Sequence, residues 1–368
     1  MFLFETDTRS QKPACMGLLS VAPMMDYTDR HYRFFLRLLS RHTTLYTEMV
    51  PDTAIRFGNR HKFLRYDPCE HPVVLQLGGS DSAALAESAA IGEEYGYDAI
   101  NLNCGCPSER VEHGNFGASL MADPLHVRRI VQAMNQAVSI PVTVKHRIGI
   151  RERSGVGRES YDELKQFVSA CVDGGVSHFI VHARIAILGK LNPAQNRSIP
   201  PLQYETVYRL KQDFPELFIE INGGIRTLDE AELHLKHVDG VMIGRAACDT
   251  PFLFAEADHR IYGTQNPKTA ESEKAVVRAL LPYLHSQMDE GIPVHHVLRH
   301  AANLFYGRPG ARLFRRRLAE EIFIRRDWTT ATIDEAIEEL LSCIPDDAVP
   351  LRDDEQLASS FFTPPVDR

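Results

Sequence analysis

Asn101-Leu102-Asn103-Cys104-Gly105-Cys106-Pro107 marks the end of a short apolar strand and the turn that follows it. Glycine and proline favour a turn over a continued strand. The pattern therefore indicates that thiols lie at the rim of a sheet rather than in its core. An isolated cysteine in such a place is most often a buried residue that happens to precede a turn. The position of this strand in the order of the chain favours a functional thiol instead.

Strand-like and helical runs alternate on both sides of this stretch. The strands are dense in Val, Ile and Leu, which is typical of strands buried on both faces, and the runs between them carry apolar residues at three- and four-residue spacing. Eight such units predict an α/β fold, a (β/α)8 TIM barrel. A doubly wound sheet is the alternative, but it usually carries Gly-x-Gly-x-x-Gly after its first strand, where this chain has Ala22-Pro23-Met24-Met25. The predicted strands are Leu18–Met25, Thr44–Val50, Pro72–Leu77, Ala99–Asn103, Pro141–Arg147, His178–His182, Leu217–Asn222 and Gly240–Gly244.

The pattern changes after Tyr262, where strand signals stop. Helical periodicity returns in four segments and predicts a C-terminal all-helical bundle beside the barrel. We expect a barrel domain at 1–262, a linker at 263–270, the helical domain at 271–346 and a flexible tail at 347–368. The four helical segments are Glu271–Glu290, Pro293–Phe305, Ala311–Arg326 and Ile333–Cys343.

Composition narrows the class of protein. The 368 residues are 44% hydrophobic, enough for a sizeable core, yet no apolar run is long enough to cross a membrane. The N-terminus lacks the pattern of a signal peptide, and seven scattered cysteines do not resemble a disulfide framework. We therefore expect a cytoplasmic protein. Cys104-x-Cys106 alone cannot complete a zinc site, so no metal is expected.

The carboxyl ends of the predicted strands carry an unusual set of polar residues. In a TIM barrel these ends converge on one mouth, so the side chains should lie close together even though they are far apart in sequence. A random distribution over loops would not end so many strands in polar groups. The set, in chain order, is Glu48, Gln76, Asn103 with Cys106, Lys145 with His146 and Arg147, His182 with Arg184, Asn222-Gly223-Gly224, and Gly244-Arg245.

The last two strand ends predict a phosphate site. Asn222-Gly223-Gly224 and Gly244-Arg245 expose backbone N–H groups with little side chain in the way, and short helices should begin after each. Arg245 can add a bidentate contact. Lys145 could then stabilise negative charge on a reduced flavin ring, and Gln76 could match the edge of its pyrimidine portion.

Two other roles for Lys145 remain open. It could form a Schiff base, as in barrel aldolases, or pair with Glu48 in a structural role. An aldolase does not explain Cys106, whereas reduction of a carbon–carbon double bond by a flavin needs an acid to protonate the second carbon. A thiol has an ordinary pKa of about 8.5 and is mostly protonated at neutral pH. We expect Cys106 to be that acid, and Cys104 to pack.

The helical segment near the C-terminus has a marked excess of positive charge. Although the chain carries a net charge of −8, the range 292–317 has six arginines and no Asp or Glu. A basic face is often merely solvated, but the absence of any balancing acid favours a surface for a phosphate backbone. The expected contacts are Arg299, His300, Arg312, Arg315 and Arg316.

The order of these motifs resembles that of the tRNA-dihydrouridine synthases, over about Leu18 to Arg326. The motifs are Ala22-Pro23-Met24, Asn103-x-Gly105-Cys106-Pro107-Ser108, Lys145-x-Arg147, His182-Ala183-Arg184, Asn222-Gly223-Gly224 and Gly244-Arg245. Asn196-Arg197-x-Ile199-Pro200-Pro201-Leu202, after the His182 motif, is similar to the A-type branch. Cys104 departs from the family pattern, in which an apolar residue is expected.

The resemblance implies an FMN barrel with a helical RNA-binding domain, and NADPH-dependent reduction of uridine at tRNA positions 20 and 20a. It implies Cys106 as proton donor to C5 while hydride reaches C6, and a base flipped out of its stack. Asn103, Arg184 and Arg197 would contact the tRNA. No obligate protein partner and no membrane are expected. The implied FMN contacts are Pro23, Met24, Met25, Gln76, Lys145, His182, Asn222, Gly223, Gly224, Gly244 and Arg245.

Two other functions stay open from the sequence. A flavin barrel could reduce a small molecule, in which case the basic helical domain would have no substrate to bind. A barrel could also serve as a non-catalytic RNA chaperone, in which case the protein would bind no flavin.

Overall fold

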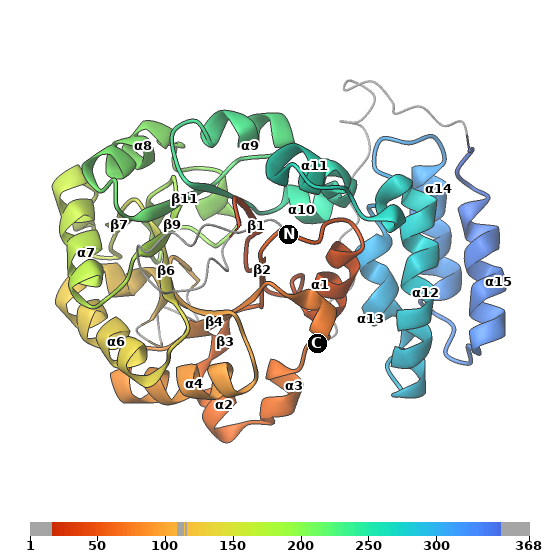
Figure 1. The fold of residues 1–368 in the computed structure, drawn as a ribbon, viewed down its shortest axis with the longest axis horizontal. Coiled ribbons are helices and arrows are strands. Elements are labelled where there is room, and N and C mark those ends of the chain that lie inside the picture. Colours follow the sequence, from red (N-terminus) through yellow and green to blue (C-terminus); the bar gives the residue numbers. More distant parts are fainter. Residues whose placement is uncertain (1–16, 109–113, 115, 347–368) are drawn as a thin grey trace, which may run out of the picture.

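The computed structural model describes residues 17–108, 114 and 116–346, and a ring of parallel strands forms its centre (Figure 1). The strands of the ring are β1 (Leu19–Val21), β2 (Leu45–Tyr46), β4 (Val73–Gly78), β5 (Ala99–Cys104), β6 (Val142–Arg147), β9 (His178–His182), β11 (Phe218–Asn222) and β12 (Gly240–Ile243). They pair in the order β1-β12-β11-β9-β6-β5-β4-β2. A parallel bridge between Ser20 and Thr44 joins the two ends of this order. The predicted TIM-like barrel is therefore confirmed.

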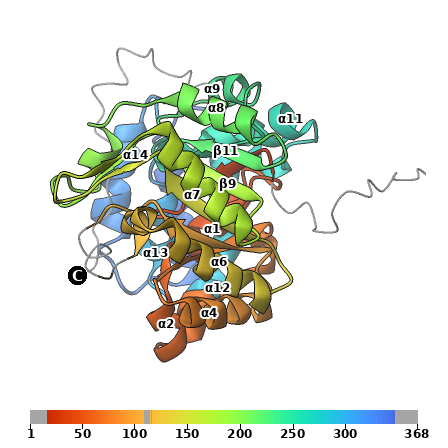
Figure 2. The same ribbon diagram turned by 90° about the vertical axis from the view of Figure 1, so that its left-hand side faces the viewer.

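Helices cover the outside of the ring, and Figure 2 shows some of them in front of the strands. Their starts follow from local sequence. Asp81 accepts a hydrogen bond from Ala84 N, and Ser160 forms a capping box with Glu163. The helices are α1 (Arg30–Arg37), α2 (Asp52–Phe57), α3 (Arg60–Leu64), α4 (Ser82–Glu94), α6 (Pro124–Ala137), α7 (Tyr161–Asp173), α8 (Tyr204–Asp213), α9 (Leu228–His234), α10 (Ala246–Asp249) and α11 (Ala257–Tyr262).

Two features of the barrel differ from the prediction. The second predicted strand, Thr44–Val50, is divided into β2 and β3 (Val50–Pro51). In the gap, the Thr47 hydroxyl accepts a hydrogen bond from Gln76 N at 3.0 Å, so a side chain replaces part of the strand ladder. A separate sheet pairs β7 (Ile150–Arg151), β8 (Gly157–Arg158) and β10 (Ala186–Ile187).

The C-terminal part contains the four predicted helical segments. They are α12 (Glu273–Asp289), α13 (Val294–Leu298), α14 (Ala311–Arg317) and α15 (Thr330–Leu341). A π-helix at Leu318–Ile322 continues α14, and a 3-10 turn at Lys268–Glu271 lies in the predicted linker. The domain boundaries stay a prediction, and the predicted tail at 347–368 lies outside the described residues.

The C-terminal helices pack against α1 of the barrel (Figure 1). The rings of Phe34 and Tyr283 stack with centroids 3.8 Å apart. Asp29 caps α1 and forms ion pairs with Arg299 and with His300, whose Nε2 lies 3.0 Å away. Helix α1 therefore connects the barrel to the C-terminal helices.

The inside of the barrel contains a layer of apolar side chains. Tyr46, Val74, Ala99, Ile180 and Met242 form a small buried cluster there. Polar side chains follow on the same inward faces, because residues two apart on a strand point to one face. This arrangement closes the barrel below and leaves a polar layer at its mouth. In the part of the chain that the structure describes, no helix is both long and apolar enough to cross a membrane.

Candidate active site

A row of side-chain amides crosses three neighbouring strands at the mouth. Gln76 Nε2 donates to Asn101 Oδ1 at 2.7 Å, and Asn101 Nδ2 donates to Thr143 Oγ1 at 2.8 Å. Asn103 Nδ2 donates to Gln76 Oε1 at 2.9 Å. These residues are almost fully buried, so their hydrogen bonds fix the amide orientations. Gln76 therefore has a rigid place at the mouth.

The turn after β5 is shaped by the side chain of Asn103. Its Oδ1 accepts hydrogen bonds from Gly105 N at 3.0 Å and Cys106 N at 2.9 Å. The Cys106 carbonyl accepts from Ala118 N at 2.9 Å, and its thiol lies 3.5 Å from Ser108 Oγ. Cys106 is thus held at a partly exposed rim position, as its place at the strand end predicted.

Cys104 is the last residue of β5, and its side chain lies on the outward face of the strand, opposite to that of Asn103. It is fully buried in the outer core, as expected, and burial raises the pKa of its thiol. Both Cys104 and Cys106 are free thiols. The two sulfurs therefore have different surroundings although the residues are two apart.

Positive charge converges on the mouth. Burial lowers the pKa of Lys145 to about 8, with a further contribution from Arg147. Burial likewise lowers the pKa of Arg147 to about 10, and burial together with Arg147 and Lys145 holds His182 well below its ordinary pKa. None of Lys145, Arg147, Arg184 and Arg245 has an ion-pair partner among the described residues. Such a cluster favours an anionic ligand.

The geometry at the last two strand ends fits a phosphate. Gly223 and Gly224 have φ angles of 121° and 77°, which favour glycine, and a side chain at either position would meet Leu202. His182 Nδ1 and Arg184 Nε are buried and have no hydrogen-bond partner among the described residues. These nitrogens, the glycine backbone and the nearby Arg245 together suit an anionic ligand. Helix α10 begins directly after Arg245, as predicted.

The loop after β1 is held by two polar contacts. Thr28 Oγ1 accepts a hydrogen bond from Met24 N at 3.0 Å. Asp26 has a left-handed φ of 67°, and its N–H donates to Glu48. Burial and the neighbouring Asp29 raise the pKa of Glu48 to about 7. The Met24–Asp26 segment is therefore a constrained turn at the mouth.

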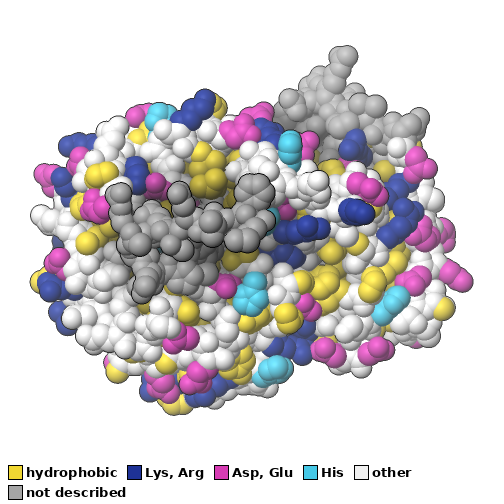
Figure 3. Space-filling view, in the orientation of Figure 1, with side chains coloured by type: hydrophobic (Ala, Val, Ile, Leu, Met, Phe, Trp, Pro, Cys, Tyr) yellow, Lys and Arg dark blue, Asp and Glu magenta, His cyan; other side chains and the backbone are white. Residues whose placement is uncertain are grey.

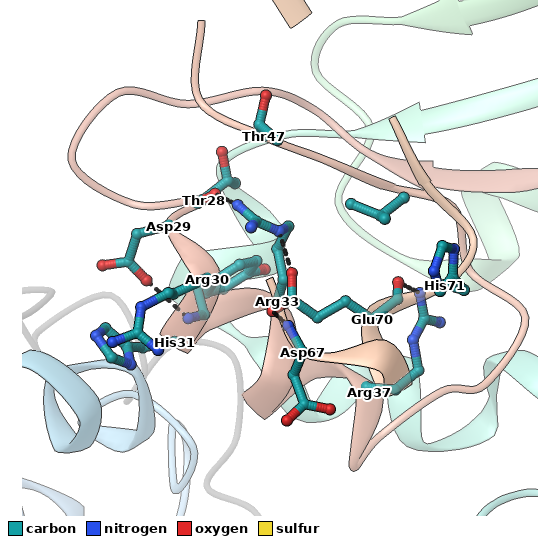
Figure 4. Close-up of polar contacts among 12 residues, drawn as sticks. Thr28, Asp29, Arg30, His31, Arg33, Arg37, Thr47, Asp67, Glu70 and His71 are labelled. Carbon is teal, nitrogen blue, oxygen red and sulfur yellow. Dashed lines mark hydrogen bonds and ion pairs between the residues drawn. The ribbon is translucent and has the colours of Figure 1, made fainter. Parts of the chain in front are cut away.

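A buried ion pair supports this loop from outside the barrel (Figure 4). Arg33 donates to the Thr28 carbonyl at 2.8 Å and to Glu70 Oε2 at 2.6 Å. Arg33 and Glu70 are 4% and 0% exposed, so loss of either partner would leave a buried charge. The loop position consequently depends on residues of α1.

Comparison with known proteins assigns the family. The family model for dihydrouridine synthase matches residues 20–341, which is most of the chain. The chain belongs to the dihydrouridine synthase family. The predicted family resemblance is thus confirmed.

Several curated members of the family are similar over most of their length. Proteins named tRNA-dihydrouridine(20/20a) synthase from Synechocystis and Pseudomonas putida are each 52% identical to this chain, over 83% and 89% of it and 90% and 95% of their own lengths. The Escherichia coli protein of that name is 52% identical over 83% of this chain and 86% of its own. A solved 2-naphthoyl-CoA reductase complex matches 70% of this chain and 51% of its own with a TM-score of 0.50 at 10% identity, a likeness of fold alone.

The residues predicted to contact tRNA fall in two regions. Arg197 is exposed on the loop after β9, whereas Arg184 is 9% exposed and donates to the Pro200 carbonyl. Cys106 is close enough to Arg197 to affect its pKa, which places Arg197 at the mouth. The hydrogen bonds of Asn103 orient the Cys106 turn, a role that the sequence did not indicate.

The basic face of the C-terminal helices is smaller than predicted. Arg312 and Arg316 are exposed on α14, but Arg315 is 8% exposed, and burial lowers its pKa. Arg299 and His300 face Asp29. Burial alone would raise the pKa of Asp29, but His300 and Arg299 outweigh it and hold that pKa below its ordinary value. Figure 3 shows cationic and anionic side chains interspersed over this part of the surface.

Arg147 is predicted from the sequence to lie at a strand end, but the sequence does not indicate its role. Its Nε donates to the Gly105 carbonyl at 3.2 Å, and its Nη1 donates to the Ile185 and Asn196 carbonyls at 3.1 and 2.9 Å. It thereby joins the Cys106 turn to the loop after β9. The alternation Lys145-x-Arg147 was the available signal, because it places both cations on the inward face.

Proposed function

We propose that this protein reduces the C5–C6 double bond of uridine at positions 20 and 20a of the tRNA D-loop, giving dihydrouridine. Family membership and the names of its relatives support the reaction and the substrate. The observation that carries the proposal is the placement of the Cys106 thiol on a rigid turn beside the cation cluster. Cys106 affects the pKa of Lys145 and of Arg147, so the thiol and both cations lie at one mouth.

FMN is the proposed cofactor and NADPH the proposed reductant. Bound FMN would supply the hydride that reaches C6 of uracil. His182 and Arg184 have buried nitrogens available for a phosphate, and Lys145, which donates to Asn222, would supply a positive charge to the flavin ring. The free cysteines fit a cytoplasmic setting. The proposed FMN contacts are Pro23, Met24, Met25, Gln76, Lys145, His182, Asn222, Gly223, Gly224, Gly244 and Arg245.

Cys106 is the proposed general acid. Its Sγ–H would protonate C5, so that the double bond gains one hydride and one proton. Asn103 holds the Cys106 backbone, and Arg147 holds the adjacent Gly105 carbonyl, so the thiol meets the base in one orientation. Arg197, exposed beside Cys106, is available to the flipped nucleotide.

The substitution Cys106→Ala tests this assignment. The variant should keep its flavin and the reduction of that flavin by NADPH, but lose dihydrouridine formation by at least about 10²-fold, because only the proton donor is removed. Cys69→Ala removes an exposed free thiol and serves as the matched control. Dihydrouridine is measured in unmodified tRNA after incubation with enzyme and NADPH.

Three results would contradict the proposal. A normal yield from Cys106→Ala would exclude the thiol as the acid. Failure of the purified protein to retain or take up FMN would exclude the cofactor. Reduction of free uridine as fast as tRNA would favour a small-molecule substrate.

A further inference from the structure

Glu220 is the only Asp or Glu in the eight described strands of the barrel. It lies on β11 with its side chain inside the barrel, and it is 1% exposed. Strand register pairs Glu220 with Ile180 of β9, and Ile180 in turn with Lys145 of β6. Glu220 and Lys145 therefore both point into the barrel, from two strands that are separated only by β9.

The contacts of Glu220 indicate a carboxylate held in one orientation. Ser20 donates its hydroxyl proton to Glu220 Oε1, and His178 Nε2 lies 3.2 Å from Oε2. Glu220 also acts electrostatically on Tyr46, whose buried hydroxyl has no hydrogen-bond partner among the described residues. These partners come from three other strands, β1, β9 and β2. A buried acid in such a place costs stability unless its charge interacts favourably with another.

Lys145 is the ionisable group on which the Glu220 carboxyl group can act. Its Nζ donates to Asn222 Oδ1 at 3.1 Å, and Asn222 donates to the Met242 carbonyl at 2.8 Å. The ammonium therefore has a neutral hydrogen-bond partner, and no carboxylate within the described part of the chain forms an ion pair with it. The titratable and charged groups that act on Lys145 or on its neighbour His182 are Arg147 of β6, Cys106 after β5, Glu220 of β11, Arg184 after β9 and Arg245 after β12.

Most of these groups oppose a charge on Lys145. Burial and Arg147 lower its pKa, whereas Glu220 and then Cys106 raise it. Glu220 is the only carboxyl group in this set, and its effect on the pKa of Lys145 is larger than that of Cys106. Loss of its charge would leave a partly buried ammonium among other cations.

We propose that Glu220 is a positioning residue that keeps Lys145 protonated at neutral pH and so maintains the positive potential of the proposed flavin site. The proposal rests on the function proposed above, in which Lys145 faces the flavin. If the role of Glu220 were purely structural, its hydrogen bonds would only connect the neighbouring strands. If its role is electrostatic, its removal changes the pKa of Lys145, which lies on another strand.

The experiment measures the protonation of Lys145 directly. Protein with its flavin bound is prepared with 13C at lysine Cε, and the Cε shift is followed against pH by NMR. The chain has nine lysines, and the Lys145 signal is the one missing from Lys145→Gln. In Glu220→Gln the midpoint should fall by about one pH unit, as expected for one charge about two strand spacings away at an effective dielectric constant near 20.

Two further variants distinguish an electrostatic role of Glu220 from a structural one. Glu220→Asp retains the carboxylate and should keep the midpoint close to that of the wild type. Ser20→Ala removes a hydrogen bond to Glu220 but no charge, and it should also leave the midpoint in place.

The proposal is overturned if Glu220→Gln folds and leaves the midpoint unchanged, or if Ser20→Ala lowers it as much. Should Glu220→Gln not fold, a wild-type midpoint below pH 7 would also overturn the proposal, because Lys145 would then be uncharged at neutral pH. Flavin absorbance in the same samples reports separately on the proposed function. A protein without flavin but with the expected midpoint shift would contradict only the function.

Discussion

Replacement of Asn103 by alanine should affect both stability and catalysis. The side chain makes three hydrogen bonds, to Gln76 Oε1, Gly105 N and Cys106 N. At about 1 kcal/mol net for each bond the sum is about 3 kcal/mol. Gly105 and Cys106 are partly exposed, and water can satisfy their N–H groups after the change. We therefore expect the free energy of unfolding to fall by about 2 kcal/mol.

The catalytic effect should be larger than the loss of stability. Without Asn103 the turn is no longer fixed relative to β4, and the thiol moves away from the substrate. A displacement of about 1 Å costs on the order of 10²-fold in rate. Dihydrouridine formation is measured in a single turnover with the flavin already reduced, so that the NADPH step does not contribute. Urea unfolding gives the stability of the same protein.

The matched control is Asn59→Ala. Asn59 caps α3 by accepting a hydrogen bond from Lys62 N at 3.2 Å, and it is exposed on the outside of the barrel. It should cost about 1 kcal/mol and leave turnover unchanged. A rate close to that of the wild type in Asn103→Ala, with the expected loss of stability, would refute the assigned role of Asn103.

Three further predictions concern other parts of the molecule. Charge reversal of Arg312 and Arg316 should weaken tRNA binding and reduce the salt dependence of the dissociation constant, with no change in flavin content; an unaltered salt slope would place the RNA elsewhere. The pKa of Glu48 is raised to about 7 in the folded protein, above its unfolded value of about 4.3. The free energy of unfolding should therefore fall as the pH rises between these two values. Glu48→Gln should flatten that part of the stability profile in urea unfolding, and an unchanged profile would disprove it. Asp29→Asn leaves the partly buried Arg299 guanidinium without its carboxylate partner and should cost about 3 kcal/mol, and identical unfolding curves for variant and wild type would count against this ion pair.

The barrel could be predicted because its signals are local. The strand His178–His182 is predicted with the bounds that the structure gives it, since buried parallel strands and amphipathic helices have distinct periodicities. The small sheet was missed because β7, β8 and β10 have two residues each, too few to show a period. The break between β2 and β3 depends on the Thr47 hydroxyl, whose partner Gln76 is 29 residues away.

The site could be predicted only in part, for a similar reason. The order of strand ends brings Cys106 and Lys145 to one mouth, and topology alone is sufficient for that. The burial of Arg315 could not be predicted from the sequence, because helical spacing shows which face of the helix a residue occupies but not which other elements cover that face. The ion-pair partner of Arg299 could not be predicted either, since Asp29 lies 270 residues earlier in the chain.

The attachment of the C-terminal helices to α1 has a consequence for truncated forms of the protein. A fragment ending at Tyr262 would expose the ring of Phe34 that stacks on Tyr283, and Asp29 would lose its contacts with Arg299 and His300. The same helix carries Arg33, which holds the Thr28 carbonyl next to the loop at the mouth. Expression of the barrel by itself should therefore give aggregation-prone material with weakened flavin retention, even though every strand of the ring is present.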